Sequence, residues 1–456
     1  MQATHSLASR PLRVQRRSVL CRCESNGAKK KVVVLGGTGR VGSATAVSLI
    51  DNFSQQYEIT VASRSQESFD KICELRPGLK NARFAPCDIT NKESIKALIA
   101  GTDLVLHTAG PFQHSKNFNV IEAALETKTP YIDVCDDTHY SQGIKGYHDQ
   151  AVAAGIPALT TAGIYPGTSN VMAAHIVSIS RGEYDENWNY KQPAAGEGIE
   201  PTMLRYSYYT AGSGGAGPTI LETSFLLAGE QCTVYKEGQA YQLPPISNRR
   251  EVDFGPVFKE GQAYQLPPIS NRREVDFGPG IGRKGVYLYN LPEVMSAFKY
   301  IKVPGVSARF GTDPFIWNWA MWLVARLCPP QFLQDRSQVR WLARLSDPWV
   351  RIVDKIIGEA VGMRVEVDFE GGKNASGIYV HKKLPEAMGN SVAAFAHAVL
   401  SGQSQPGVWY PEEKEALADR RAFLQYAAKG CTRFDLNRPA WALESDVKQL
   451  GGLIYW

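Results

Sequence analysis

A glycine-rich segment near the start of the chain has the residue types and spacing that bind a dinucleotide diphosphate. It consists of Gly36, Gly37, Thr38, Gly39, Arg40, Val41 and Gly42. An apolar run at 32–35 precedes it and a helix-like stretch at 43–50 follows it. In this order, Gly36 permits a tight turn, Gly39 lets a pyrophosphate approach, and Gly42 lets helix and sheet pack closely. Unpaired amides at the helix start attract the phosphates, so the segment predicts nucleotide binding.

The residues after the second expected strand (57–62) indicate which dinucleotide is bound. An NAD-preferring site places a carboxylate about 20 residues past the glycines, where it accepts from the ribose 2′-hydroxyl. Ser63 and Arg64 stand there instead. Because a 2′-phosphate requires a cation and hydroxyl donors, the pair favours NADP(H) over NAD; the alternative is a solvated loop arginine. Asp88, in a third expected strand (84–89), would accept from the adenine amino group or cap the next helix.

Residues for hydride transfer are expected at the carboxyl ends of the later strands, where open α/β sheets bind their ligands. A buried run at 104–112 contains the loop residues Ala109, Gly110 and Pro111, and the first two would let the nicotinamide ribose lie against the backbone. The reaction also requires an acid or base. The candidates at or near strand ends are His107, Asp133, Asp136, Asp137 and Tyr165. The acids are equally suited to capping the following helices, so the catalytic residue stays open.

These segments require a sheet that brings them together. Further strands are expected at 130–136 and 158–162, and helix-length stretches separate the strands throughout. This alternation is typical of an α/β fold with a Rossmann-type doubly wound parallel sheet covered on both faces.

The motifs taken in order resemble those of the saccharopine dehydrogenase-like oxidoreductases, and most closely the plastid and bacterial members of unassigned substrate. The motifs are GGTGRVG, VLHTAGPF, PYIDVCDD and GIYPGTSN. The resemblance implies an NADP-binding Rossmann domain at 29–170 and a second α/β (α+β) domain at 171–385 for substrate binding and homodimerisation. It also implies a C-terminal helical part at 386–456 that returns to the Rossmann domain.

Composition and charge describe an ordinary globular protein with a basic N-terminal segment. The chain has 456 residues, 44% hydrophobic and 21% charged, with a net charge of +5. Residues 1–28 hold five arginines and one acid, or +4, which leaves about +1 for the rest and argues against nucleic-acid binding. The same segment has the composition of an organelle transit peptide, for the chloroplast or else the mitochondrion; the alternative is a disordered arm.

Cysteine and histidine usage indicates a reducing compartment and no metal site. Six cysteines past residue 28 are scattered without CxxC spacing and are expected to be buried small apolar residues. The eight histidines form no metal-ligand cluster. His107 and His114, seven residues apart, are expected to be structural.

The second half has a different organisation. A β-like run at 203–209 is followed by a glycine-rich stretch and a helix that starts at Pro218. Asp347 and Pro348 are expected to begin an amphipathic helix that ends at Gly362. Alternating residues at 364–369 and 377–381 predict a strand pair.

Residues 234–256 recur at 257–279 with one change, Tyr235 to Phe258. Two copies are too few for a solenoid, so a recent duplication or a gene-model error explains them better than function does. One copy is expected to pack poorly and carry no site.

The tryptophan-rich stretch at 314–325 is shorter than the roughly 20 apolar residues that span a bilayer. Its tryptophans indicate burial in a core or subunit interface, or peripheral membrane contact through Phe315–Val324.

Three functions fit these features. The first is an NADP-dependent oxidoreductase for a small carbonyl, imine or secondary-amine substrate. The second is a non-catalytic NADP(H)-binding protein. The third is a membrane-peripheral reductase of lipid or isoprenoid type.

Overall fold

The computed structural model describes residues 28–185, 189–194, 196–212, 218–230, 232–243, 272–314 and 316–444. Apart from residue 28, the expected transit peptide lies outside these ranges. In the described part of the chain, no helix is long and apolar enough to cross a membrane.

The first domain is built on a seven-stranded parallel sheet, in the order β15-β6-β5-β4-β1-β2-β3. Its strands are β1 (Lys30–Leu35), β2 (Tyr57–Ser63), β3 (Arg83–Pro86), β4 (Leu104–His107), β5 (Tyr131–Asp133), β6 (Pro157–Leu159) and β15 (Gly407–Trp409). The central strand β1 is apolar on both faces, as a doubly covered parallel sheet requires. The predicted Rossmann-type fold is confirmed.

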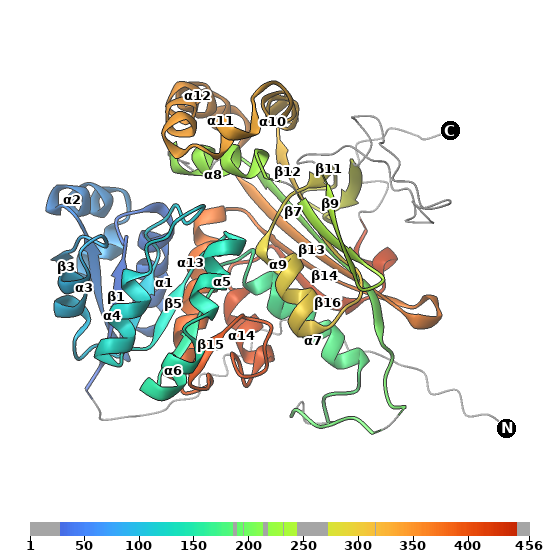
Figure 1. Cartoon of the computed structure of the whole chain (residues 1–456), viewed down its shortest axis with the longest axis horizontal. Helices are drawn as coiled ribbons and strands as arrows, with labels where there is room; N and C mark the ends of the chain where they lie inside the picture. The colour runs from blue at the N-terminus through green and yellow to red at the C-terminus, as the bar shows by residue number, and fades with distance from the viewer. Residues whose placement is uncertain are drawn as a thin grey trace.

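Helices cover both faces of this sheet (Figure 1). They are α1 (Arg40–Phe53), α2 (Gln66–Leu75), α3 (Lys92–Ile99), α4 (Asn119–Thr127), α5 (Thr138–Lys145), α6 (His148–Ala154), α13 (Leu384–Leu400) and α14 (Arg420–Ala427). The late helix α13 packs on α1 so closely that a Cβ on Gly389 would lie 2.5 Å from the carbonyl oxygen of Ala44. Together with β15, this contact brings the C-terminal part of the chain back to the first domain.

The second domain is a nine-stranded mixed sheet, in which seven strands follow the order β10-β11-β12-β7-β13-β14-β16 and β8 and β9 branch from β12. The strands are β7 (Pro201–Ala211), β8 (Cys232–Lys236), β9 (Gln239–Leu243), β10 (Arg273–Asp276), β11 (Arg283–Leu288), β12 (Val306–Asp313), β13 (Ala360–Phe369), β14 (Asn374–His381) and β16 (Arg433–Arg438). The predicted strand run at 203–209 lies in β7, and the predicted strand pair is the antiparallel pair β13–β14.

The helices of the second domain form two groups (Figure 1). One group lies against the sheet and comprises α7 (Thr168–Ser180), α9 (Pro292–Ser296) and a π-helical turn, Ala297–Ile301. The other lies at the upper end of the molecule and comprises α8 (Pro218–Ala228), α10 (Ile316–Leu327), α11 (Pro330–Gln334) and α12 (Arg336–Ile357). Short 3-10 turns complete the set at Pro77–Asn81, Glu370–Gly372 and Ala440–Leu443.

One apolar cluster joins the two domains. It runs from Val34 on β1 through Val392 on α13 and Met172 on α7 to Tyr206 on β7. A second cluster fills the opposite face of the first sheet, around Val105. The domains therefore share a core, which fixes the first sheet against the second.

The helix predicted to run from Asp347 to Gly362 is wrong at both ends. α12 begins at Arg336, where Asp335 accepts from the amide of Ser337 at 2.8 Å, and Pro348 lies inside it. Strand β13 already begins at Ala360. A proline lacks the amide in either position, so an Asp-Pro pair alone does not distinguish a helix start from an interior proline.

The described strands use parts of both copies of the duplicated segment. The β8–β9 hairpin contains residues 234–243 of the first copy, whereas β10 belongs to the second. The expectation that one copy packs poorly falls largely on residues 244–271, outside the described ranges.

Candidate functional site

The glycine turn between β1 and α1 has the close packing that only glycine permits. Gly36 has φ +73°, and a Cβ there would lie 2.7 Å from the Cα of Ala109. A Cβ on Gly42 would lie 2.5 Å from the carbonyl oxygen of Gly36, and one on Gly37 would lie 2.8 Å from that of Val34. The β4–α4 loop and the start of α1 therefore meet at this turn, as the motif predicts.

The start of α1 is suited to a diphosphate. Gly39 is its N-cap, without a side-chain cap, and the first turn carries no acid. The first amides of a helix have no intrahelical partner, so an anion can bind them directly. The predicted phosphate-binding residues Thr38, Arg40 and Val41 are half-buried around this point. The arrangement fits a dinucleotide.

The predicted adenosine-binding residues lie beside the same sheet edge, at the ends of β2 and β3. Arg64 is exposed, and Ser63 is half-buried. Asp88 is exposed and accepts from the Thr90 amide and hydroxyl, both at 2.9 Å. These bonds, and to a smaller extent the charge of Arg64, lower the pKa of Asp88. The alternative role of Asp88 as a helix cap is wrong, because Asn91 caps α3 and accepts from the Ser94 amide.

His107 and Asp133 lie side by side at the ends of β4 and β5, in the interior. Burial lowers the pKa of His107 to about 3, so the ring is neutral. Asp133 accepts from the amides of Cys135 and Thr161 at 2.9 and 3.0 Å, and thereby ties β5 to the loop after β6. Burial raises the pKa of Asp133 to about 6.

The two acids after β5 have different partners. Asp137 caps α5 and accepts from the Tyr140 amide at 2.6 Å, which is the capping role left open by the sequence. Asp136 accepts from the Gln113 side chain at 2.6 Å, and Gln113 also accepts from Thr223 on α8. Burial raises the pKa of Asp136 to about 6. Asp136 therefore belongs to a polar link between the first domain and α8.

Tyr165 follows β6 and stacks on Tyr208 of β7, with 4.8 Å between ring centroids. Burial raises the pKa of the Tyr165 hydroxyl, while the charge of Arg40 acts in the opposite direction. Tyr165 thus lies between the glycine turn and the second sheet.

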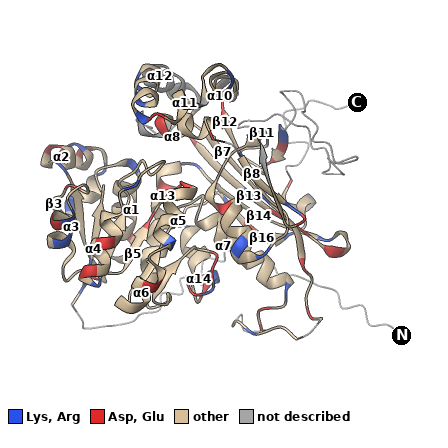
Figure 2. Cartoon of the chain, in the orientation of Figure 1, with Lys and Arg blue, Asp and Glu red and all other residues tan. Residues whose placement is uncertain are grey.

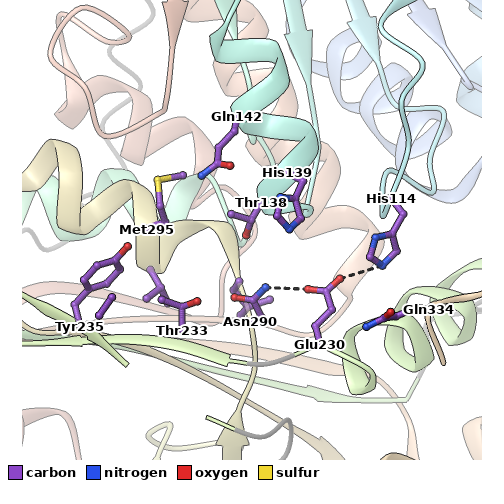
Figure 3. Close-up of a pocket in the computed structure, with 13 residues that line it drawn as sticks. His114, Thr138, His139, Gln142, Glu230, Thr233, Tyr235, Asn290, Met295 and Gln334 are labelled. Carbon is purple, nitrogen blue, oxygen red and sulfur yellow. Dashed lines mark hydrogen bonds and ion pairs between the residues drawn. The ribbon is translucent and has the colours of Figure 1, made fainter. Parts of the chain in front are cut away.

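A pocket of about 430 Å³ opens between the two domains. Figure 3 shows its polar side chains converging from the first domain and from the second. It is lined by His114, Thr138, His139, Gln142, Glu230, Thr233, Tyr235, Ala240, Asn290, Leu291, Val294, Met295 and Gln334. His107, Asp133, Asp136 and Tyr165 do not line it, so their catalytic role stays a prediction.

Glu230, just past the end of α8, is the only carboxylate among these described lining residues. Its side chain lies 3.3 Å from Nε2 of His114 and accepts from the Asn290 amide nitrogen at 2.8 Å (Figure 3). Burial is the largest effect on Glu230, and it raises the pKa of the carboxyl group. The nearby charge of Asp137 also raises this pKa, whereas the hydrogen bond from Asn290 and the charges of His114 and His139 lower it. No lysine or arginine is among the described lining residues. The pocket therefore favours a positively charged or hydrogen-donating group.

Sequence reasoning missed most of this pocket. Glu230 and His139 belong to no motif, and only the tertiary fold brings them together with Asn290. His114 was expected to be structural, yet it lines the pocket. The signal that could have identified it is its position, seven residues past the end of β4, on the side of the sheet where ligands bind.

The family model described as the saccharopine dehydrogenase NADP binding domain matches residues 32–159. The first domain is therefore similar to this NADP-binding domain. The match covers the glycine turn and the strands from β1 to β6, which shows that the first domain binds a nicotinamide dinucleotide.

The carboxynorspermidine synthases of Vibrio alginolyticus and Vibrio cholerae are 28% and 27% identical to this chain over 160 and 168 residues. These alignments cover 31% and 33% of this chain, and 38% and 40% of the two synthases. The chain thus matches about two fifths of the length of these relatives.

Two solved structures share the fold over nearly the whole chain. Saccharopine dehydrogenase (L-Glu forming) from Saccharomyces cerevisiae has a TM-score of 0.58 at 13% identity, covering 90% of this chain and 99% of its own. Homospermidine synthase from Legionella pneumophila, solved with NAD, has a TM-score of 0.56 at 13% identity, covering 91% and 92%. Both domains of this chain therefore have the fold of these enzymes.

Proposed function

We propose that this chain is an NADP(H)-dependent oxidoreductase that transfers a hydride to or from a carbon bonded to nitrogen in a small amine or imine. The observation that carries the proposal is the pocket between the domains. Its Glu230 carboxylate contacts a histidine, and its described lining contains no lysine or arginine. The pocket adjoins the loop after β4, against which the nicotinamide end of the cofactor is expected to lie.

Glu230 would hold the substrate nitrogen. A protonated amine beside a buried carboxylate gains Coulomb energy that it lacks in water, and it also lowers the raised pKa of Glu230. The apolar side chains of Leu291, Val294 and Met295 would contact the substrate's carbon skeleton. Two relatives are named for the synthesis of carboxynorspermidine and homospermidine, which are amines, and this supports the same substrate class here.

His114 would carry the proton. In amine oxidation, the carbon loses a hydride, the nitrogen loses a proton to the His114 ring, and a carbon–nitrogen double bond forms; reduction is the reverse. The nicotinamide ring supplies or accepts the hydride when it is bound. The contact between His114 and Glu230 would keep the ring oriented toward the nitrogen.

Arg64 supports NADP(H) as the cofactor. It is exposed at the end of β2 beside Ser63, where a guanidinium and a hydroxyl can bind a 2′-phosphate. The first test is the melting temperature with NADPH and with NADH. We expect the larger increase with NADPH, and Arg64→Asp should reverse the preference. A larger increase with NADH in the unchanged chain would refute the role of Arg64.

The second test addresses the substrate class. Reduction of NADP⁺ is measured with a panel of small primary and secondary amines. Glu230→Gln should raise KM about tenfold or more for an amine that is turned over, while NADPH binding stays unchanged. Glu237→Gln, at an exposed position in the β8–β9 turn, is the matched control and should behave like the unchanged chain. Equal KM values for the two variants would exclude Glu230 as the amine-binding group.

Saccharopine itself is not expected to be a substrate. Its carboxylates would require cationic partners such as arginine or lysine, and the described pocket lining contains neither. Turnover of saccharopine at a rate comparable to that of the best amine would contradict this reading of the pocket.

A further inference from the structure

The large apolar side chains that are exposed gather in one part of the molecule. Nine such residues are exposed in the described chain, and five of them lie on α10 and α12. These are Trp319, Leu323, Leu327, Trp341 and Leu345, each between 48% and 70% exposed. Scattered single apolar residues are normal on a protein surface, but a concentration of tryptophan and leucine marks an interaction site.

Helical spacing places these residues in two stripes. Trp319, Leu323 and Leu327 are four residues apart on α10, and Trp341 and Leu345 are four apart on α12, so each set shares a face of its helix. The inward sides of these helices are apolar as well, as buried Met321 and Val339 show. The outer stripes are therefore additional to the core contacts, and α10 and α12 form the outermost layer at this end of the molecule (Figure 1).

The charge around the stripes has one sign. Residues 314–346 contain four arginines (Arg326, Arg336, Arg340, Arg344) and one acid, Asp335. Asp335 is committed to capping α12. Arg326, Arg340 and Arg344 are exposed, and basic residues appear on both helices in Figure 2. Arg340 has a distant ion pair with Glu222 of α8, at 3.6 Å.

We propose that the α10–α12 face (Trp319, Leu323, Leu327, Trp341, Leu345 with Arg326, Arg340 and Arg344) docks on an anionic lipid membrane. Tryptophan rings reside at the boundary between headgroups and acyl chains, and exposed arginines beside them pair with anionic headgroups. This combination of apolar stripes and positive charge is what an interfacial helix presents to a membrane.

A second copy of the chain fits this face less well. In a two-fold dimer the face would meet itself, which would bring the arginines of both copies together. Among residues 314–346 the one acid is the helix cap Asp335, so burial would leave most of these arginines unpaired at a cost. An anionic membrane supplies the missing negative charge.

The docking face is connected to the candidate site. Gln334, the last residue of α11, lines the pocket. Arg336, the first residue of α12, donates to the carbonyl oxygen of Pro111 in the expected nicotinamide loop at 2.8 Å. Docking would therefore fix the orientation of the pocket relative to the membrane, although the proposal holds whether or not the pocket is catalytic.

Co-sedimentation of the full chain with vesicles tests the proposal. One set is phosphatidylcholine alone, and the other contains about a quarter phosphatidylglycerol. We expect binding to the anionic vesicles that weakens as salt rises above about 0.1 M. Trp319→Ser with Trp341→Ser should weaken it about tenfold or more. Arg326→Gln with Arg344→Gln should remove the preference for anionic lipid.

Leu75→Ser is the matched control, since Leu75 is 78% exposed on α2, away from the face. It should bind as the unchanged chain does. All substituted side chains are exposed, so the melting temperatures of the variants should stay the same. The basic N-terminal segment is common to all variants, so differences in vesicle binding report on the α10–α12 face. Unchanged binding by the double tryptophan variant would overturn the proposal. The proposal would also be overturned if the unchanged chain bound no vesicles but formed a dimer in light scattering, and the double tryptophan variant were a monomer. The face would then contact a second copy.

Discussion

Replacing Glu293 by glutamine is expected to change how the stability of the chain depends on pH. Glu293 lies on α9, next to residues that line the pocket, and it is fully buried. Burial raises its pKa from 4.5 to about 7, and the nearby charges of Glu412 and Asp136 add to this effect. Glutamine has nearly the same shape but cannot ionise, so it removes the effect without leaving a cavity.

The magnitude follows from the two pKa values. Between pH 4.5 and about pH 7, the folded chain keeps a proton on Glu293 that the unfolded chain has lost. Stability from this group is therefore fully present below about pH 4.5 and is lost as the pH rises to about 7. At about 1.4 kcal/mol for each pH unit, the full effect is about 3 kcal/mol, of which about 2 kcal/mol falls between pH 5.5 and pH 8.5.

Urea unfolding of the unchanged chain and Glu293→Gln, at pH 5.5 and at pH 8.5, measures the effect. The free energy of unfolding should fall about 2 kcal/mol more in the unchanged chain than in the variant. Burial lowers the pKa values of His107 and His175 to about 3, so these residues reduce the free energy of unfolding at acid pH. Both histidines are present in both proteins, so their effect cancels in this comparison. Exposed Glu370→Gln is the control and should follow the unchanged chain. Parallel pH profiles for Glu293→Gln and the unchanged chain would refute the reasoning.

Two further predictions concern the glycine turn and the duplicated segment. Gly42→Ala places a Cβ 2.5 Å from the carbonyl oxygen of Gly36, so it should cost about 1–3 kcal/mol of stability and abolish NADPH binding. At exposed Gly39 a Cβ comes no closer than 3.1 Å to that oxygen, so Gly39→Ala should keep most of the stability and still weaken NADPH binding. Unfolding curves measure the stability of the two variants, and fluorescence titration measures their NADPH binding. Deleting residues 244–266 joins Leu243 to Pro267 and restores a single 23-residue unit. The melting temperature should stay within about 2 °C, and an insoluble or strongly destabilised product would show that the fold needs both copies.

The first domain could be predicted from the sequence because its signals are local. The glycine motif is contiguous in the chain, and the expected strands alternate with helices along it. The antiparallel pairing of β13 with β14 could also be predicted, because apolar and polar residues alternate in both strands and a short loop joins them.

Helix boundaries were harder to predict from the sequence where a residue type fits both the start and the interior of a helix. Pro348 lacks its amide both at a helix start and inside a helix, and the cap that decides the matter, Asp335, lies thirteen residues earlier. Likewise, Pro411 begins no helix, and α14 begins at Arg420, where Asp419 accepts from the Ala422 amide. In both cases the side chain of the cap, rather than the proline, sets the start.

The candidate pocket could not be predicted because its two halves come from different domains. His114 lies on the loop after β4, whereas Glu230 follows α8 and Asn290 lies between β11 and α9. The contact between His114 and Glu230 spans 116 residues of chain and depends on how the shared core sets the second sheet against the first. The residues of one turn therefore identify the kind of nucleotide that a Rossmann sheet binds. The proposed substrate-binding residue, Glu230, comes instead from the second domain, which lies across the strand ends.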